Sequence, residues 1–245
     1  MAVLVVIPAR YGSTRFPGKP LAMIAGKPMI QHVYEGAAAS GADEVVVATD
    51  DERIRQAVER FGGKVAMTSP EARSGTDRVA EVARARQAAV VINVQGDEPL
   101  VHPSMIAPLA DFLSRHAAVP MGSLMTKLAR AEDAGNPNVV KVVVDRDGFA
   151  LYFSRSAIPF ARAGSPQVWK HLGIYGYQRH FLLQFPSLPP TPLEQAEQLE
   201  QLRALEHGYR IKLLETQHDS IGVDTPDDLK LVEGMLQRPT GSRHG

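Results

Sequence analysis

Short, almost uninterrupted apolar runs alternate with amphipathic segments along the first hundred residues. The apolar runs span 3–9, 44–50, 64–68 and 90–94, and the helix-like segments span 28–40, 51–61 and 76–88. Strands without polar alternation are buried on both faces, as in a parallel sheet, and a strand–helix–strand rhythm implies right-handed crossovers. The pattern predicts an open α/β fold with a mostly parallel sheet.

The second half of the chain follows a different rhythm. Two β-rich runs within 138–155 flank Asp147-Gly148, and Asp-Gly is a strong signal for a hairpin turn. The remaining predicted elements are a strand at 170–178 leading into a helix, one helix over 193–208 ending at Gly208, a strand over 209–215 and a helix from Thr225 to 238. Without repeats or long linkers, we expect one domain over 1–237 and a flexible tail, 238–245.

Composition narrows the classes of partner. The 245 residues carry 27 Lys and Arg against 27 Asp and Glu, so no net charge points to a nucleic acid or a membrane surface. The absence of cysteine excludes disulfides, thiolate metal sites and a cysteine nucleophile. The start, MAVLVVIPAR, has no basic region before its apolar run, which is too short to span a membrane. We expect a cytoplasmic protein that binds no nucleic acid and does not insert into membranes.

Cations gather in the loop after the first predicted strand. Arg10, Arg15 and Lys19 stand there among glycine, serine and proline. Ligands of open α/β sheets bind beyond the carboxyl ends of the strands, where loop N–H groups can hold phosphates. The loop matches neither GxGxxG nor GxxxxGK[ST], so it predicts neither a dinucleotide fold nor a P-loop. It predicts a polyphosphate site, with a solvated loop as the alternative.

Carboxylates reach the same edge of the predicted sheet. The buried strand in VINVQGDEPLV is followed by Gln95, Asp97 and Glu98, and Asp224 stands just before the last helix. Mg²⁺ prefers one or two carboxylates together with phosphate oxygens and water, which makes Asp97 and Asp224 candidate metal ligands. The alternatives are an ordinary turn at Asp97 and a helix-capping acid at Asp224.

A second glycine-containing turn follows the third predicted strand. Ser74, Gly75 and Thr76 open a helix, and Arg78 lies in its first turn. Loop N–H and carbonyl groups at such a position can read the edge of a base. The alternative is a normal N-cap at Ser74 or Thr76 with an exposed arginine.

The order of these segments resembles the 3-deoxy-manno-octulosonate cytidylyltransferase (CMP-Kdo synthetase) family to about residue 231. The motifs that carry the resemblance are VVIPARYGSTRFPGKPL, VATDDERI, SGTDRVAEV, INVQGDEPLV, NPNVVKVVVDRDGFALYFSRSAIPF, KHLGIYGY, PLEQAEQLEQLRALEHG and GVDTPDDL. The first is shared with other sugar nucleotidyltransferases. QGDEP, FSR-x-x-IPF, HLGIYGY and LEQLR are more specific to this family.

The resemblance implies a nucleotide-diphospho-sugar transferase (Rossmann-like) fold and a Mg²⁺-dependent, homodimeric enzyme that makes CMP-Kdo and pyrophosphate from CTP and Kdo for lipopolysaccharide synthesis. It implies a nucleotide-binding half, 1–120, and a β-rich half for sugar binding and dimerisation, 121–237. The implied CTP-binding residues are Ala9, Arg10, Ser13, Arg15, Lys19, Ser74, Gly75 and Arg78. Arg10, Lys19 and Asp97 would be catalytic, and Asp97 and Asp224 would bind the metal. The implied sugar-acid-binding residues are Gln95, Arg155, His171, Tyr175, Glu200 and Gln201.

Two departures from the family pattern concern affinity more than reaction class. Glu71-Ala72 stands where the family commonly carries Asp-His, and Lys170 stands where an arginine usually precedes HLGIYGY. Two other functions stay open. One is cytidylyl transfer to a related sugar acid such as 8-amino-Kdo or another nonulosonate, and the other is nucleotide binding without turnover. Two candidate metal ligands argue against the second, since binding alone requires neither.

Overall fold

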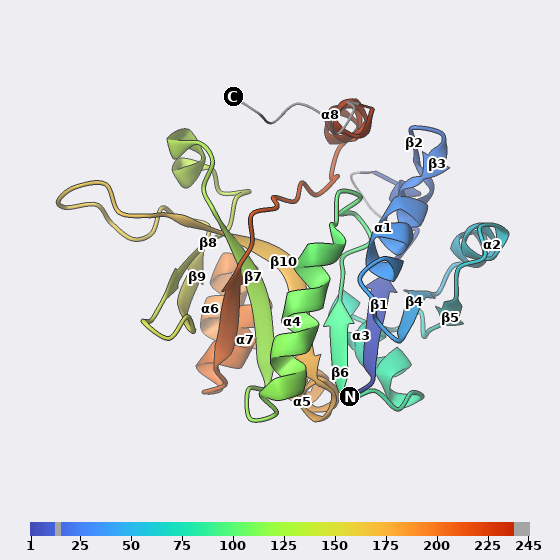
Figure 1. The fold of residues 1–245 in the computed structure, drawn as a ribbon, viewed down its shortest axis with the longest axis horizontal. Helices are drawn as coiled ribbons and strands as arrows, with labels where there is room; N and C mark the ends of the chain where they lie inside the picture. Colours follow the sequence, from blue (N-terminus) through green and yellow to red (C-terminus); the bar gives the residue numbers. More distant parts are fainter. Residues whose placement is uncertain (13–15, 238–245) are drawn as a thin grey trace.

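The computed structural model describes residues 1–12 and 16–237, in which a nine-stranded mixed sheet forms the centre (Figure 1). Its order is β11-β7-β10-β6-β1-β4-β5, with β8 paired to β10 and β9 paired to β8. The strands are β1 (Val3–Pro8), β4 (Glu44–Thr49), β5 (Val65–Met67), β6 (Val90–Asn93), β7 (Met121–Lys127), β8 (Lys141–Val144), β9 (Ala150–Ser154), β10 (Trp169–Gln178) and β11 (Ile211–Glu215).

The strands of the first half are parallel, and their apolar runs are buried on both faces. β1 pairs in parallel with β4 and β6, and β4 pairs in parallel with β5. Along β1, Leu4 and Val6 join one core cluster while Val5 and Ile7 join the other. Each such side chain removed from water contributes about 1.5–3 kcal/mol, so runs without polar alternation are stable only between two layers. The prediction of an α/β fold with a mainly parallel sheet is confirmed.

Helices cover both faces of the sheet. One core cluster contains residues of α1, α2 and α4, and the other contains residues of α3, α5 and α7. The helices are α1 (Met29–Ala38), α2 (Glu52–Arg60), α3 (Gly75–Arg84), α4 (Pro103–Arg115), α5 (Arg179–Gln184), α6 (Pro192–Glu197), α7 (Gln201–Glu206) and α8 (Pro226–Leu236). Shorter elements are the 3₁₀ turns η1 (Lys19–Leu21), η2 (Ala131–Gly135) and η3 (Phe185–Ser187), and the hairpin β2 (Met23–Ile24) and β3 (Lys27–Pro28).

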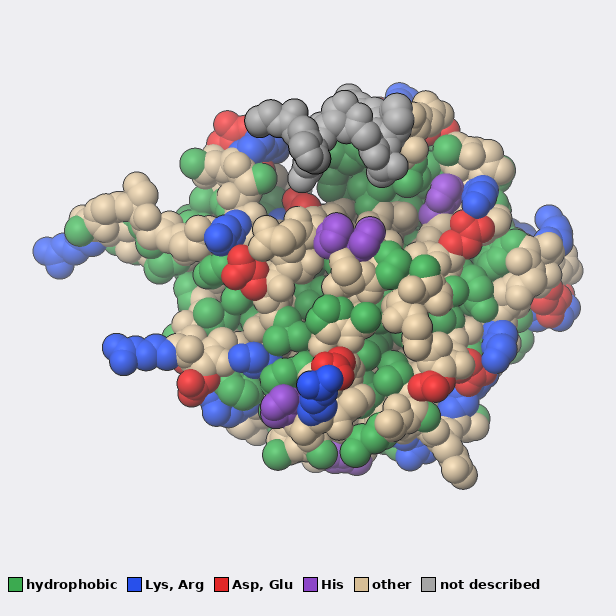
Figure 2. Space-filling model, viewed as in Figure 1, with side chains coloured by type: hydrophobic (Ala, Val, Ile, Leu, Met, Phe, Trp, Pro, Cys, Tyr) green, Lys and Arg blue, Asp and Glu red, His purple; other side chains and the backbone are tan. Residues whose placement is uncertain are grey.

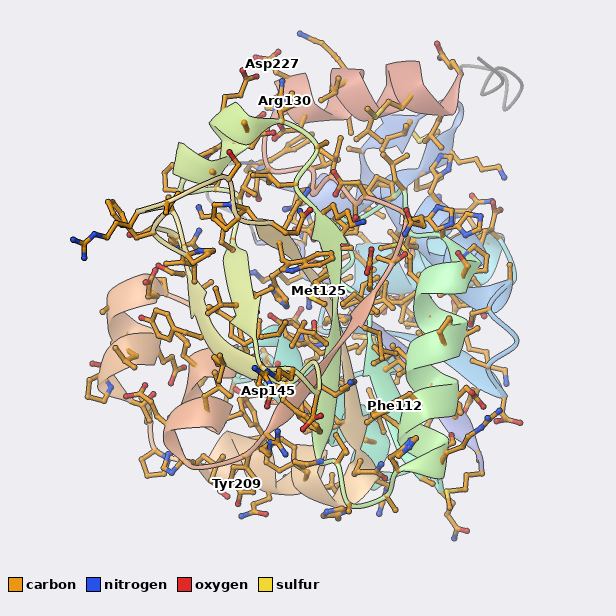
Figure 3. All side chains as sticks on the ribbon, turned by 60° about the vertical axis from the view of Figure 1, so that its left-hand side comes forward. Phe112, Met125, Arg130, Asp145, Tyr209 and Asp227 are labelled. Carbon is orange, nitrogen blue, oxygen red and sulfur yellow. The ribbon has the colours of Figure 1, made fainter. Side chains whose placement is uncertain are left out.

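The antiparallel strand β10 joins the two halves of the molecule. It pairs with β7 along one side, and with β8 and then β6 along the other. The β8–β9 hairpin is the one predicted from Asp-Gly, and Gly148 adopts φ 75° in its turn. Asp145, labelled in Figure 3, accepts hydrogen bonds from the Phe149 N–H at 2.8 Å and from Arg210 Nη2 at 2.7 Å, which docks the hairpin beside β11.

Some elements differ from the sequence pattern. The single helix predicted over 193–208 is wrong, because Gln198 adopts φ 53° and separates α6 from α7. The pattern also did not predict α4 or β7. α4 carries Pro108 in its interior, and β7 (MGSLMTK) has a single β-branched residue, Thr126, although its first six residues are buried.

Within residues 1–12 and 16–237, no helix is both long and apolar enough to cross a membrane. On the face in Figure 2, basic and acidic side chains are interspersed rather than gathered by sign. This distribution matches the balanced charge of the sequence.

Two helical glycines provide a matched test of this packing. A Cβ on Gly36 in α1 would lie 2.5 Å from the Val101 backbone oxygen, whereas a Cβ on Gly234 in α8 would meet nothing within 4 Å. We expect Gly36→Ala to destabilise the fold by about 1–3 kcal/mol through overpacking. Gly234→Ala should stabilise it by about 0.5–1 kcal/mol, since alanine loses less backbone entropy in a helix. Urea unfolding of both variants checks the opposite signs; equal effects would contradict the close approach at Gly36.

Candidate active site

A cavity of about 340 Å³ opens at the carboxyl ends of β1 and β6. It brings together most of the predicted nucleotide and metal residues, namely Ala9, Arg10, Lys19, Ser74, Gly75, Arg78, Asp97 and Asp224. Gln95, predicted for the sugar acid, lines the same cavity. Ser13 and Arg15 lie outside the described residues, so their predicted role stays a prediction. The edge of the sheet expected to bind the ligand is therefore the edge that is hollowed.

The backbone brings the loops after β1 and β6 close together. The Ala9 N–H donates to the Ala48 oxygen at 2.9 Å, which fixes the exit from β1. A Cβ on Gly96 would lie only 2.7 Å from the Pro8 oxygen, so this position has room for no larger residue. The close approach places Gln95 and Asp97 directly beside the cationic loop.

Lys19 connects two carboxylates from distant parts of the chain. Its Nζ lies 2.6 Å from Asp97 Oδ2 and 3.2 Å from Asp224 Oδ1, and its side chain is only 12% exposed. Gly18, with φ 71°, precedes it at the start of η1. Where the ammonium lies, two carboxylates converge on one cation. The donor set suits a divalent ion equally well, because Mg²⁺ is commonly held by two carboxylates and by substrate phosphates.

The segment before α8 is tied to the Asp97 loop. The Val223 N–H donates to the Asp97 backbone oxygen at 2.9 Å. Thr225 caps α8, and Asp228 Oδ2 accepts from the Asp224 N–H at 3.0 Å, which orients the residue that carries the second carboxylate. Among the described residues there is no group of three or more His, Cys, Asp and Glu side chains arranged to hold a metal ion.

Glu98 is buried next to this pair. Burial raises the pKa of its carboxyl to about 7, and Ser220 Oγ donates to Glu98 Oε2 at 2.9 Å. The hydrogen bond links the Asp97 loop to the segment that leads from β11 to Asp224. Glu98 therefore helps to hold the two segments that carry Asp97 and Asp224.

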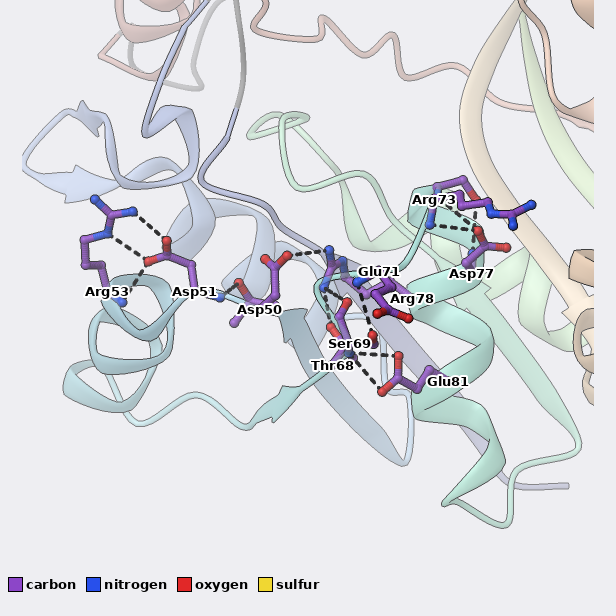
Figure 4. Close-up of polar contacts among 12 residues, drawn as sticks. Asp50, Asp51, Arg53, Thr68, Ser69, Glu71, Arg73, Asp77, Arg78 and Glu81 are labelled. Atoms are coloured by element: carbon purple, nitrogen blue, oxygen red, sulfur yellow. Dashed lines mark hydrogen bonds and ion pairs between the residues drawn. The ribbon is translucent and has the colours of Figure 1, made fainter.

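Helix α3 begins at the opposite wall of the cavity. Ser74 Oγ accepts from the Asp77 N–H at 3.1 Å in a capping box, which agrees with the N-cap alternative for this segment. Arg78, however, is buried rather than exposed. Figure 4 shows its guanidinium donating to Asp50 Oδ2 at 3.0 Å and to Thr68 Oγ1 and the Ser69 oxygen.

Asp50 was missed by the sequence pattern. It follows β4 directly, at the same sheet edge as the other site residues, and its ion pair with Arg78 joins this loop to α3. Because Arg78 also donates to Thr68 and Ser69, it links the loops after β4 and β5. The signal was its place in VATDD after an apolar run. Position alone could not distinguish it from Asp51, which caps α2.

Four of the predicted sugar-acid residues gather between β10 and α7. The His171 ring and the Tyr175 ring are 5.4 Å apart, and the Tyr175 hydroxyl donates to Gln201 Oε1 at 3.1 Å. Burial raises the pKa of the Tyr175 phenol and that of the Glu200 carboxyl. Gln201 is 3% exposed, and its Nε2 lacks a hydrogen-bond partner among the described residues. A second cavity of about 470 Å³, lined by Glu200, shares Arg73 and Ser74 with the first.

Arg155 lies apart from this group. Its Nε donates to the Glu197 oxygen at 2.7 Å and its Nη1 to the Pro137 oxygen at 2.9 Å, and it lines neither of the two cavities. The buried Lys141 donates to the Arg155 oxygen and to two further carbonyls. In this arrangement Arg155 fastens the end of β9 to α6.

Comparison with known proteins agrees with this geometry. Residues 4–212 match the cytidylyltransferase family. The 3-deoxy-manno-octulosonate cytidylyltransferase of Geobacter sulfurreducens is 55% identical over 250 residues, which cover 97% of this chain and 100% of that protein. The chain belongs to the 3-deoxy-manno-octulosonate cytidylyltransferase family.

Other comparisons agree with this family assignment, and the chain is thus a nucleotidyltransferase. A protein with the same name from Syntrophotalea carbinolica is 53% identical, with 97% of this chain and 99% of that protein covered. The solved structure of a CMP:2-keto-3-deoxy-manno-octonic acid synthetase complexed with CTP has a TM-score of 0.92 and 46% identity, covering 96% of this chain and 98% of that one. A 4-diphosphocytidyl-2C-methyl-D-erythritol synthase from Anaerococcus prevotii, at TM-score 0.65 and 12% identity, shares the fold.

The buried His171 predicts a pH dependence of stability. Burial lowers its pKa to about 3, and its Nε2 lies 2.9 Å from Ser123 Oγ. Because the folded pKa lies below the unfolded value of about 6.5, the stabilisation is complete above pH 6.5 and is lost as the pH falls. Between pH 7 and pH 5 the wild type should lose about 2 kcal/mol more than His171→Gln. Urea unfolding at both pH values measures this difference, and the same loss in both proteins would contradict a neutral buried ring.

Proposed function

We propose that the protein transfers CMP from CTP to the anomeric hydroxyl of 3-deoxy-D-manno-octulosonate (Kdo) and releases pyrophosphate. The observation that supports this most is the single cavity shared by Arg10, Lys19, Asp97, Asp224 and the start of α3. It combines cations for a triphosphate, carboxylates for a metal and a helix N-terminus at one edge of the sheet. The names of the relatives indicate that the acceptor is Kdo.

The reaction requires positioning and charge neutralisation more than covalent help from the protein. The anomeric oxygen forms a bond to the α-phosphorus, and the bond from that phosphorus to the oxygen bridging to the β-phosphorus breaks. Its electron pair leaves with pyrophosphate, and the hydroxyl proton passes to solvent. Arg10 and Lys19 would stabilise the charge that grows on the leaving group. Ala9, Ser74 and Gly75 would hold the nucleotide with backbone groups.

We propose Mg²⁺ as the cofactor, held by Asp97 and Asp224. Their carboxylates already meet at the Lys19 ammonium, so two oxygen ligands lie together at a place that accepts positive charge. When bound, the ion would neutralise phosphate charge and lower the pKa of a coordinated hydroxyl. Lys19 reduces the repulsion between the two carboxylates and offers a cation to an entering phosphate.

The acceptor sugar would bind against Gln95, His171, Tyr175, Glu200 and Gln201. Gln201 offers a buried amide with an unused donor, and Glu200 offers a carboxylate that can accept from sugar hydroxyls. We retain Arg155 as a partner for the sugar carboxylate. Since its guanidinium lies on backbone carbonyls, that role requires it to exchange at least one of them for the sugar.

The wider setting of the reaction follows from the family resemblance. We propose that the product supplies lipopolysaccharide synthesis, and that the enzyme works in the cytoplasm as a homodimer. The β8–β9 hairpin, with Leu151 62% exposed, and the α6–α7 segment are the surfaces proposed for the dimer.

Pyrophosphate release tests the proposed reaction directly. The purified protein is incubated with Mg²⁺, each nucleoside triphosphate in turn and a panel of 2-keto sugar acids that includes Kdo and 8-amino-Kdo. We expect release only with CTP, and fastest with Kdo. Faster release with another acid would reassign the acceptor, and CTP binding without release would contradict an enzymatic role.

Replacing one candidate metal ligand tests the site. Asp97→Asn keeps the shape but removes the charge, so turnover should fall at least about 100-fold. Asp227→Asn, on the exposed side of α8, is the matched control and should keep the wild-type rate. Circular dichroism checks the fold of both variants. A wild-type rate for Asp97→Asn at saturating Mg²⁺ would remove Asp97 from the metal site.

A further inference from the structure

Glu200 and Gln201 follow Gln198, whose left-handed backbone ends α6, and the two side chains contact different elements. The Tyr175 hydroxyl of β10 donates to Gln201 Oε1, and Tyr177 lies two residues along on the same face of the strand, with the two rings 6.3 Å apart. The Glu200 carboxylate instead accepts a hydrogen bond from Thr76 Oγ1 in α3. A residue of the predicted nucleotide-binding half, Thr76, therefore holds the Glu200 carboxylate in place.

Thr76 is a buried donor to the Glu200 carboxylate. It is 3% exposed, so water has little access to its hydroxyl. A threonine hydroxyl has one proton to give, and Glu200 receives it. This hydrogen bond therefore has a defined direction and fixes the orientation of the carboxylate.

The same threonine is adjacent to the nucleotide cavity. Ser74 and Gly75, which precede it, line that cavity together with Arg10 and Lys19. Ser74 also caps α3 through its side chain. One turn of chain, 74–76, therefore faces the nucleotide on one side and holds an acceptor-side carboxylate on the other.

We propose that Thr76 is a positioning residue for the acceptor: its hydroxyl fixes Glu200 for the sugar and ties that side chain to the loop that holds the nucleotide. The proposal rests on the proposed function for the identity of the two substrates. Glu200 heads a helix of only six residues after a break in α6–α7, so its own helix constrains it little. A partly buried carboxylate without this donor would lose both its orientation and part of its charge.

Thr76→Val removes the hydroxyl and keeps the branched shape. The KM for Kdo should rise about 10-fold or more, as expected for losing a hydrogen bond to a charged group, while the Kd for CTP from calorimetry changes less than about twofold. Thr76→Ser restores the donor and should return the KM for Kdo close to the wild-type value. Thr126→Val, which removes a buried hydroxyl from β7, is the matched control. Should Thr76→Val not fold, Thr76→Ala carries the same expectation.

Two further readouts separate positioning from general damage. In a Glu200→Gln background, Thr76→Val should add little to the KM for Kdo, because the group it acts through has already changed. The groups that face Glu200 are Ser74, Thr76, Asp77 and Arg203, with Tyr175 and Tyr177 from β10. Loss of one donor should move the acid limb of kcat/KM for Kdo to higher pH.

The outcomes distinguish this proposal from the proposed function. Equal losses in the kinetic constants of both substrates, or no rescue by serine, would overturn the role of Thr76 while leaving the reaction intact. No pyrophosphate release from the wild type with CTP and Kdo would overturn the proposed function itself. A KM for Kdo that Thr76→Val leaves unchanged in an active enzyme would overturn the positioning role alone.

Discussion

The ion pairs of Lys19 with Asp97 and Asp224 determine how the rest of the site is arranged. They join residues separated by 78 and 205 positions in the chain, so three independent segments must converge on one ammonium. Each segment is fixed by the backbone: Gly18 at η1, the approach of Gly96 to Pro8, and the hydrogen bond from Val223 to Asp97. Partly buried charges require partners, and the Lys19 ammonium has two of them before any ligand enters.

β10 determines how the second half meets this cavity. Because it runs antiparallel between β6 and β7, it places Tyr175 beside Asn93 of β6 and His171 beside Met125 of β7. A parallel strand would have needed a long crossover at this point. Tyr175, one of the residues proposed to bind the acceptor, therefore lies directly beside β6, the strand that ends before Asp97, and the two substrates are expected to meet where β6 and β10 pair.

The sequence predicted the secondary-structure elements and the sheet edge that carries the site better than it predicted contacts between side chains. Apolar runs such as Val3 to Pro8 indicated buried strands, and the rule that ligands bind at strand carboxyl ends correctly grouped Arg10, Lys19 and Asp97 at one edge of the sheet. The break at Gln198 could not be predicted, because the apolar spacing of 193–208 continues through it and only a positive φ interrupts the helix. The contacts of Asp50 with Arg78 and of Thr76 with Glu200 join residues on different elements, and no local pattern encodes such pairs.

Asp224 lies beyond β11, and the family match ends at residue 212. The second carboxylate that pairs with Lys19 thus leaves the ribosome after every described strand of the sheet. During synthesis, the cationic loop and the Asp97 loop can already pack against β1 and β6 while their third partner is still missing. The chain can fold its core early, but the site acquires its final electrostatics only after the segment leading into α8 has been made and has docked.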